Sequence, residues 1–225
     1  MPDISVTLNG VKVSAPAGTS ILELAKQYGV EIPTLCYLEG LPPTGACRLC
    51  VVEVEGQRTL PAACHTPIAP NMVIQTHSPK VLETRRYLVE LLLANHCGNC
   101  FMCEKANICE LRKIAADLGV GVPRFRARKR CYAVEDVSPY IRRDLAKCVL
   151  CRRCVRACAE IAHQNVFSVA YRAYDSKIVV DNDRPLDKEV CRDCDVCVQH
   201  CPTGALIRPR PLGKEKKGKA LLVTR

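Results

Sequence analysis

The chain has 225 residues, of which seventeen are cysteine, three Phe, seven Tyr and none Trp. It begins without the basic and apolar segments of a secretory signal, and no apolar run could cross a bilayer. We therefore expect a cytoplasmic location, reduced thiols and no membrane insertion. The formal charge of +10 leaves out metal-bound thiolates, which would cancel much of it, so we expect no nucleic-acid partner.

The N-terminal region has the pattern of a small α+β domain over residues 1–78. Apolar residues alternate on either side of Asn9-Gly10, a pair that favours the type I′ turn of a β-hairpin. Ser20 and Glu23 have the spacing of a capping box at a helix start. The elements expected are strands at 4–8, 11–13, 51–54 and 72–76 and a helix over 20–28.

Beyond residue 78 the apolar residues recur at the spacing of a helix. We expect a helical module over 79–118, with one helix ending near Asn95 and a second following Cys109. Residues 119–143 have the composition of a connector. Residues 144–208 contain an internal repeat, with short strands expected at 166–169 and 178–180, and residues 209–225 form a basic tail.

The repeat carries the strongest chemical signal. Each half has the spacing C-x2-C-x2-C-x3-C, which is typical of bacterial ferredoxins, where the fourth cysteine binds the other cluster of a pair. Only the second half continues with proline, at Pro202; Ala159 stands in that place in the first. Zinc sites use two-cysteine knuckles instead. The spacing predicts two [4Fe-4S] clusters, one on Cys148, Cys151, Cys154 and Cys201, the other on Cys158, Cys191, Cys194 and Cys197.

A second set lies in the N-terminal domain with the spacing C-x10-C-x2-C-x13-C. Plant-type [2Fe-2S] ferredoxins share this outline of a loop cysteine, a close pair and a distant fourth, although their first spacing is shorter. A zinc site is the alternative. His65, next to the last cysteine, is interpreted as a neighbouring group rather than a ligand. The predicted [2Fe-2S] ligands are Cys36, Cys47, Cys50 and Cys64.

The helical module holds a mixed set, H-x3-C-x2-C-x5-C. A neutral imidazole in place of a thiolate removes one negative charge, which raises the reduction potential of a cluster. Cys97 competes with His96 for the fourth position, and its alternative role is a buried thiol. Cys131 belongs to no set. The predicted ligands of this third [4Fe-4S] cluster are His96, Cys100, Cys103 and Cys109.

One [2Fe-2S] and three [4Fe-4S] clusters, when oxidised, would bring the net charge to roughly +3. No dinucleotide or phosphate-binding glycine motif is present, so we expect no NAD or flavin site and no catalytic residue on this chain.

In the order of its motifs the chain resembles the N-terminal part of the large iron–sulfur subunit of respiratory complex I, over about residues 1–208. The same modules occur in [FeFe] hydrogenases, NAD-linked formate dehydrogenases and the small diaphorase subunit of NAD-reducing [NiFe] hydrogenases. The resemblance implies an α+β protein. Its parts would be an N-terminal β-grasp [2Fe-2S] ferredoxin-like domain, a helical His/Cys3 cluster module and a C-terminal 2[4Fe-4S] bacterial-ferredoxin-like domain.

Length favours the diaphorase-type subunit, since no large catalytic domain and no further cysteine follow Cys201. This implies a non-catalytic electron-relay subunit of an oxidoreductase complex. Its partners would be a flavin- and NAD(P)H-binding diaphorase subunit, a hydrogenase or formate dehydrogenase catalytic subunit, and in some complexes a ferredoxin. The alternatives are an electron-input subunit of a formate dehydrogenase or complex I-like assembly, a free multi-cluster ferredoxin, and a zinc-stabilised nucleic-acid module.

Overall fold

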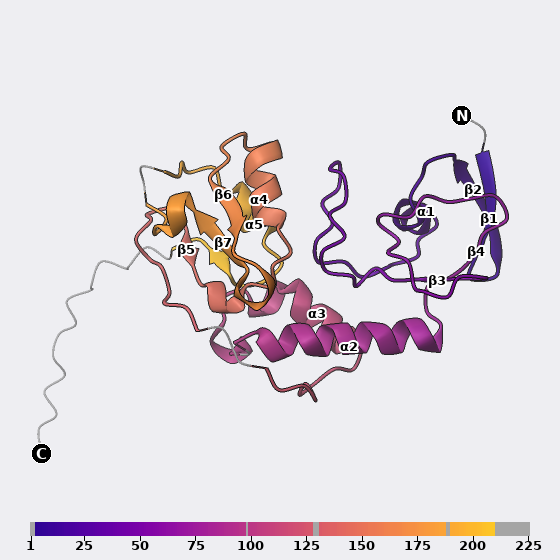
Figure 1. The fold of residues 1–225 in the computed structure, drawn as a ribbon, viewed down its shortest axis with the longest axis horizontal. Coiled ribbons are helices and arrows are strands. Elements are labelled where there is room, and N and C mark those ends of the chain that lie inside the picture. The colour runs from indigo at the N-terminus through magenta and orange to yellow at the C-terminus, as the bar shows by residue number, and fades with distance from the viewer. Residues whose placement is uncertain (1–2, 98, 128–130, 188–189, 210–225) are drawn as a thin grey trace, which may run out of the picture.

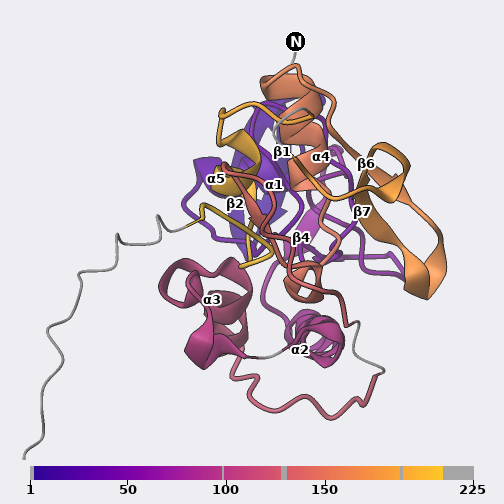
Figure 2. The same ribbon diagram turned by 90° about the vertical axis from the view of Figure 1, so that its left-hand side faces the viewer.

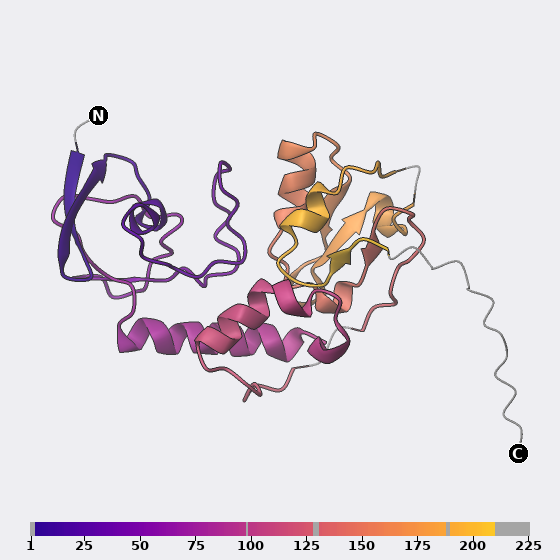
Figure 3. The same ribbon diagram turned by 180° about the vertical axis from the view of Figure 1, so that it is seen from behind.

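The computed structural model describes residues 3–97, 99–127, 131–187 and 190–209. Two regions built from sheet and short helices lie at opposite ends of the molecule, and the long helix α2 (Pro79–Asn95) runs along one side of both (Figure 1). Seen from behind, α3 (Glu110–Asp117) lies against α2 beneath the C-terminal region (Figure 3). Within the described ranges no helix has the length and apolar character of a transmembrane segment.

The N-terminal region is a mixed four-stranded sheet in the order β2-β1-β4-β3. The first two strands form an antiparallel hairpin, and Asn9 and Gly10 between them both have positive φ, as a type I′ turn requires. β4 pairs in parallel with β1 and antiparallel with β3. The strands are β1 (Asp3–Leu8), β2 (Val11–Pro16), β3 (Glu53–Val54) and β4 (Val73–Gln75).

Helix α1 (Ile21–Gln27) follows the hairpin and contributes to the same core. Its N-terminus carries the expected capping box, in which the Ser20 hydroxyl and the Glu23 carboxylate each accept from the other's backbone N–H. Ile21 and Leu24 are completely buried and pack with alternate residues of the sheet. The sequence patterns for the hairpin and for this helix are confirmed.

The helical module consists of α2, two short 3-10 turns and α3. Ser78 caps the start of α2, where Pro79 costs no hydrogen bond, and the helix ends at Asn95 with His96 as its C-cap. Figure 2 shows α2 end-on with α3 beside it. The 3-10 turns are η1 (Cys100–Met102) and η2 (Ala106–Ile108).

The C-terminal region contains two short antiparallel strand pairs, β5 with β8 and β6 with β7. β6 and β7 fall within one residue of the strands expected between the two cysteine motifs. The β5–β8 pair joins segments more than 60 residues apart and was not expected. The elements are β5 (Arg142–Arg143), η3 (Leu145–Lys147), α4 (Arg153–Arg156), a π-helical turn (Ala157–Ile161), β6 (Phe167–Ala170), η5 (Ala173–Asp175), β7 (Lys177–Val180), η6 (Asp181–Asp183), α5 (Val196–His200) and β8 (Leu206–Ile207).

The end of the expected connector is fixed to this region by a buried ion pair. The Arg143 side chain is 1% exposed and donates to Glu135 at 2.7 Å, and a second nitrogen donates to the carbonyl of Ile178 at 3.4 Å. The backbones of Glu135 and Arg143 also exchange two hydrogen bonds, because the N–H of each donates to the carbonyl of the other. The four domain boundaries stay predictions, and of the expected basic tail only Pro209 lies among the described residues.

Removing one partner of a buried pair leaves the other charge uncompensated. We expect Glu135→Gln to lower the free energy of unfolding by about 3 kcal/mol, because Arg143 would remain buried without its carboxylate. Chemical denaturation followed by circular dichroism measures this. The neighbouring Asp136 is exposed, so Asp136→Asn should stay within about 0.5 kcal/mol of the wild type. Equal effects of the two substitutions would contradict the assignment.

Candidate metal centres

The structure brings the four N-terminal cysteines together beside the sheet. The Cys50 and Cys64 sulfurs lie 3.4 Å apart, and Cys64 is close enough to Cys36 and Cys47 for their charges to act on it. Cys36, Cys50 and Cys64 are buried, and the Leu35 N–H donates to the Cys47 sulfur at 3.4 Å. Residues distant in the chain therefore form one compact sulfur site.

Hydrogen bonds between thiols divide this first site into two pairs. A hydrogen bond from Cys47 lowers the pKa of Cys36 to about 5, although burial acts against the shift. In the same way Cys64 lowers the pKa of Cys50 to about 7. The pKa values of Cys47 and Cys64 are raised, first by the hydrogen bonds that they share with Cys36 and Cys50. Two of the four sulfurs thus favour the thiolate form that binds iron.

The third predicted set lies where α2 ends and α3 begins. His96 is the C-cap of α2 and is 6% exposed, whereas Cys109 is the N-cap of α3 and is buried. Burial raises the pKa of Cys109, and the nearby Cys103 and Cys100 raise it further. The structure therefore brings Cys100, Cys103 and Cys109 close enough together for their charges to interact.

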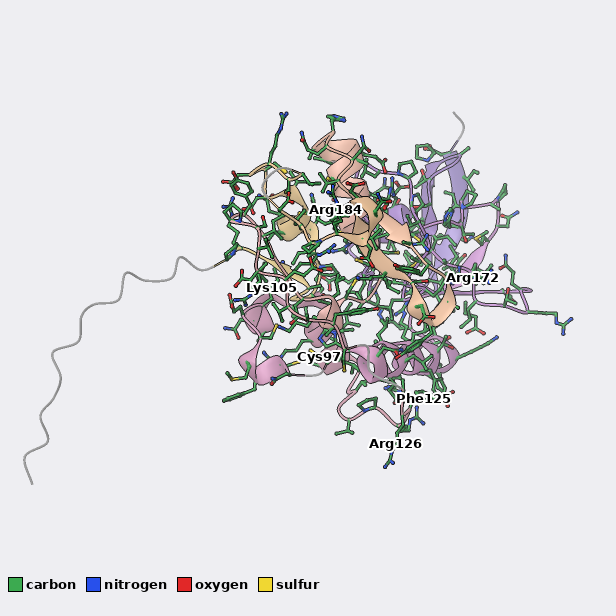
Figure 4. The ribbon with its side chains drawn as sticks, turned by 60° about the vertical axis from the view of Figure 1, so that its left-hand side comes forward. Cys97, Lys105, Phe125, Arg126, Arg172 and Arg184 are labelled. Atoms are coloured by element: carbon green, nitrogen blue, oxygen red, sulfur yellow. The ribbon has the colours of Figure 1, made fainter. Side chains whose placement is uncertain are left out.

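Cys97 lies at the edge of the same site and is half-buried. Its N–H donates to the carbonyl of Ala146 at 3.1 Å, which ties the end of α2 to η3. The charges of Cys103 and Cys97 both act on Lys147. Figure 4 labels Cys97 next to the helical module. The choice between His96 and Cys97 as the fourth ligand stays a prediction.

In the C-terminal region the cysteines of the two motifs lie close to one another, and their crossed division between two clusters stays a prediction. The pKa of Cys154 is raised by burial, then by the proximity of Cys148, Cys151 and Cys201, and last by Cys197 of the other set. The pKa of Cys197 is raised to about 12 by burial, then by Cys191, Cys158 and Cys194, and last by Cys201 of the other set. A small cavity is lined by all four cysteines of the second group, Cys158, Cys191, Cys194 and Cys197.

The internal repeat extends to the backbone. Arg152 and Asp195 each follow the second cysteine of their motif, and both have left-handed φ, 64° and 63°, immediately before a short helix. A left-handed non-glycine residue is uncommon. Because a left-handed residue recurs at equivalent positions, the two loops follow the same course around the three closely spaced cysteines of each motif.

The third site adjoins the C-terminal sites directly. A Cβ added to Gly204 would lie 2.6 Å from the Cys103 sulfur, so only glycine leaves room for this approach. Lys105 donates to the carbonyls of Val198 and Cys201 at 2.8 and 2.9 Å. The Thr203 hydroxyl donates to the Lys147 carbonyl at 2.8 Å. The sequence gives no signal for these contacts, because each joins segments 50 or more residues apart.

The first site adjoins the third through a shared apolar cluster. Leu35 and Leu49, from the loops that carry the first cysteine set, are completely buried against Val89 of α2 and Leu111 of α3. Cys109 belongs to the same cluster. A groove of about 950 Å³ lies beside it, lined among others by Tyr37, Arg85, Ile114, Arg153 and His200.

The donor sets fit iron–sulfur clusters. Buried, crowded sulfurs disfavour the thiolate form unless a bound cation compensates them, and burial is the main reason why the pKa of Cys151 is raised. Among the described residues no three His, Cys, Asp or Glu side chains converge as a mononuclear site. In a [4Fe-4S] cluster each thiolate binds a different iron atom, and in a [2Fe-2S] cluster each iron binds two of the four thiolates, so four sulfurs need not meet at one point. His65 and Cys131 are exposed.

Comparison with known families divides the chain in the same way. Residues 2–79 match the 2Fe-2S iron-sulfur cluster binding domain. Residues 85–124 match the NADH-ubiquinone oxidoreductase-G iron-sulfur binding region. Residues 138–207 match the ferredoxin-like domain of NADH-quinone oxidoreductase subunit 3. A [2Fe-2S] domain followed by [4Fe-4S] ferredoxin-like regions is thereby confirmed.

Among curated proteins, the chain is 39% identical over 212 residues to the NADP-reducing hydrogenase subunit HndD of Solidesulfovibrio fructosivorans. This alignment covers 92% of this chain and 36% of that protein. The chain is also 33% identical over 208 residues to the mitochondrial NADH-ubiquinone oxidoreductase 78 kDa subunit of Candida albicans, and that alignment covers 92% of this chain and 28% of the Candida protein. The chain thus spans about a third or less of these relatives. A crystal structure of an NAD+-reducing [NiFe]-hydrogenase in the H2-reduced state contains a similar chain, with a TM-score of 0.83, 27% identity, and 91% and 87% coverage.

The approach of Gly204 to Cys103 gives a direct test. We expect Gly204→Ala to reduce iron bound at the third site, because the added methyl group must displace the Cys103 sulfur. Iron per chain after anaerobic reconstitution measures the loss. Gly121 has open space around the position of a Cβ and no positive φ, so Gly121→Ala should bind the wild-type amount of iron. Full iron content in Gly204→Ala would contradict the assigned contact.

Proposed function

Because this chain belongs to the iron–sulfur protein family of the complex I large subunit and its hydrogenase relatives, we propose that it is the electron-relay subunit of a soluble NAD(P)-linked hydrogenase or related complex. Electrons would pass between a flavin- and NAD(P)H-binding diaphorase partner and a catalytic partner that oxidises H2 or formate. When bound, the one [2Fe-2S] and three [4Fe-4S] clusters supply one-electron acceptance and donation.

The observation that carries the proposal is the continuity of the sites. The first cysteine set shares a buried cluster with Cys109 of the third, and Cys103 of the third lies against Gly204, three residues after Cys201. A relay needs redox centres in close succession, and the chain's own packing provides this order without a partner. The ligands proposed are the four sets predicted from the sequence.

The surface near the third site supports a subunit over a freely diffusing carrier. Phe101, Met102 and Ile108 lie between the cysteines of this set and are 96%, 72% and 73% exposed. Three large apolar side chains exposed within one eight-residue segment support an interaction site there. Leu91 on α2 is also exposed, at 46%.

The first test is the content of the purified chain. After anaerobic reconstitution we expect about 14 iron atoms per chain, with matching acid-labile sulfide and little zinc. Low-temperature EPR of the reduced protein should show one [2Fe-2S] signal together with [4Fe-4S] signals. The chain alone should not reduce NAD, because the flavin is expected on a partner. Several zinc atoms without labile sulfide would refute the relay.

The ligand choice at the third site has its own test. His96→Ala should lose about four iron atoms, because an incomplete ligand set does not hold a [4Fe-4S] cluster. Cys97→Ala should keep all of them. Iron and sulfide content of the two variants, with EPR, measures the difference. The reverse pattern would make Cys97 the ligand.

A further inference from the structure

Arg85 is a buried cation beside the first site. It lies on α2, and only 1% of its surface is exposed, although the groove between the two regions reaches it. Its Nε donates to the carbonyl of Leu49 at 3.1 Å and its Nη2 to the carbonyl of Val51 at 2.8 Å. These two residues flank Cys50. The guanidinium group therefore fixes the backbone on both sides of Cys50, one of the proposed ligands.

In the part of the chain that the structure describes, no carboxylate lies within ion-pair distance of Arg85. The other two buried arginines are paired, Arg143 with Glu135 and Arg153 with Glu110. Burial lowers the pKa of Arg85 to about 10, and the one charge that acts against this is Cys50. The side chain is still protonated at neutral pH, so a full positive charge stays buried there.

An uncompensated buried ion costs several kcal/mol. The two carbonyl acceptors bind two of its five N–H donors and leave its charge unbalanced. A [2Fe-2S] cluster on four thiolates carries a charge of about −2, and one more when reduced. This negative charge is the counter-ion that no carboxylate of the described residues supplies to Arg85.

We propose that Arg85 is the counter-cation of the [2Fe-2S] cluster, raising the reduction potential of that cluster and coupling the docking of α2 to its presence. The inference rests on the proposed cluster at the first site. A fixed positive charge favours the more negative, reduced state, which shifts the potential upward. Because the same side chain belongs to α2, the charge attraction also draws the helix onto the N-terminal domain.

The test uses the full chain, reconstituted anaerobically, with Arg85→Met, Arg85→Lys and Arg86→Met. An EPR-monitored redox titration gives the midpoint potential of the [2Fe-2S] signal. Arg85→Met removes the charge at similar length and should favour the oxidised form about tenfold, a downward shift of about 59 mV for one electron. Arg85→Lys keeps the charge and should remain near the wild-type potential.

Arg86 provides the matched control. It is the next residue on the same helix but is exposed, and its Nε donates to the carbonyl of Leu118 at 3.0 Å. Arg86→Met removes the same charge away from the first site. Its [2Fe-2S] potential should equal that of the wild type.

Thermal unfolding with and without clusters gives a second readout. Arg85→Met should lower the melting temperature more in the cluster-loaded protein than in the cluster-free protein, because in the cluster-free protein the substitution also removes an unpaired charge.

An equal fall in melting temperature in the two forms, or an unchanged [2Fe-2S] potential, would overturn the proposal. Arg85 would then only connect α2 to the N-terminal domain by its hydrogen bonds. Loss of the cluster in both Arg85 variants would also overturn the proposal, whereas loss in Arg85→Met alone would support it. Absence of a [2Fe-2S] signal from the wild type would instead refute the proposed function.

Discussion

The contact between the Cys103 sulfur and Gly204 is the constraint on which the arrangement of the sites depends. It brings the loop of the helical module against the last turn of the C-terminal motif, with no side chain between them. Lys105 and Thr203 close the same junction by hydrogen bonds to backbone carbonyls. With this junction fixed, α2 carries the connection onward to the N-terminal domain, so that four separately predicted ligand sets form one succession.

Buried arginines stabilise the other junctions, but by different means. Arg143 and Arg153 have carboxylate partners and need nothing else to balance their charge. Arg85 is bonded to carbonyls alone, at a junction where a cofactor is expected. The chain thus uses protein ion pairs where protein meets protein, and leaves a cation unbalanced where a bound anionic group would lie.

Patterns local in the sequence predicted much of the fold. The Asn9-Gly10 hairpin and the Ser20 capping box depend on residues a few positions apart, and so do the two ferredoxin-type motifs. Pairings between distant segments could not be predicted in this way, as β5 with β8 shows. Helix α2 shows why. Its apolar residues marked a helix, yet the structure buries Arg85 and leaves Leu91 half exposed, because other parts of the chain decide which face is covered.

The same limit applies to the sites. Cysteine spacing predicted ligand sets because three proposed ligands of each [4Fe-4S] set lie within a short segment, and the sets themselves stay predictions. It gave no sign of Gly204, Lys105 or Arg85, whose roles depend on what they meet in space.

The crossed grouping of the C-terminal cysteines also has a consequence for biosynthesis. On the proposed ligand sets, the cluster begun by Cys148, Cys151 and Cys154 is completed only by Cys201, and the cluster of the second motif needs Cys158 from the first. The ribosome must therefore make the β6–β7 hairpin and α5 before either cubane has its fourth ligand. The nascent chain would carry exposed, oxygen-sensitive thiols from the synthesis of Cys148 until that of Cys201, so metal delivery to this region has to wait until both motifs have been made.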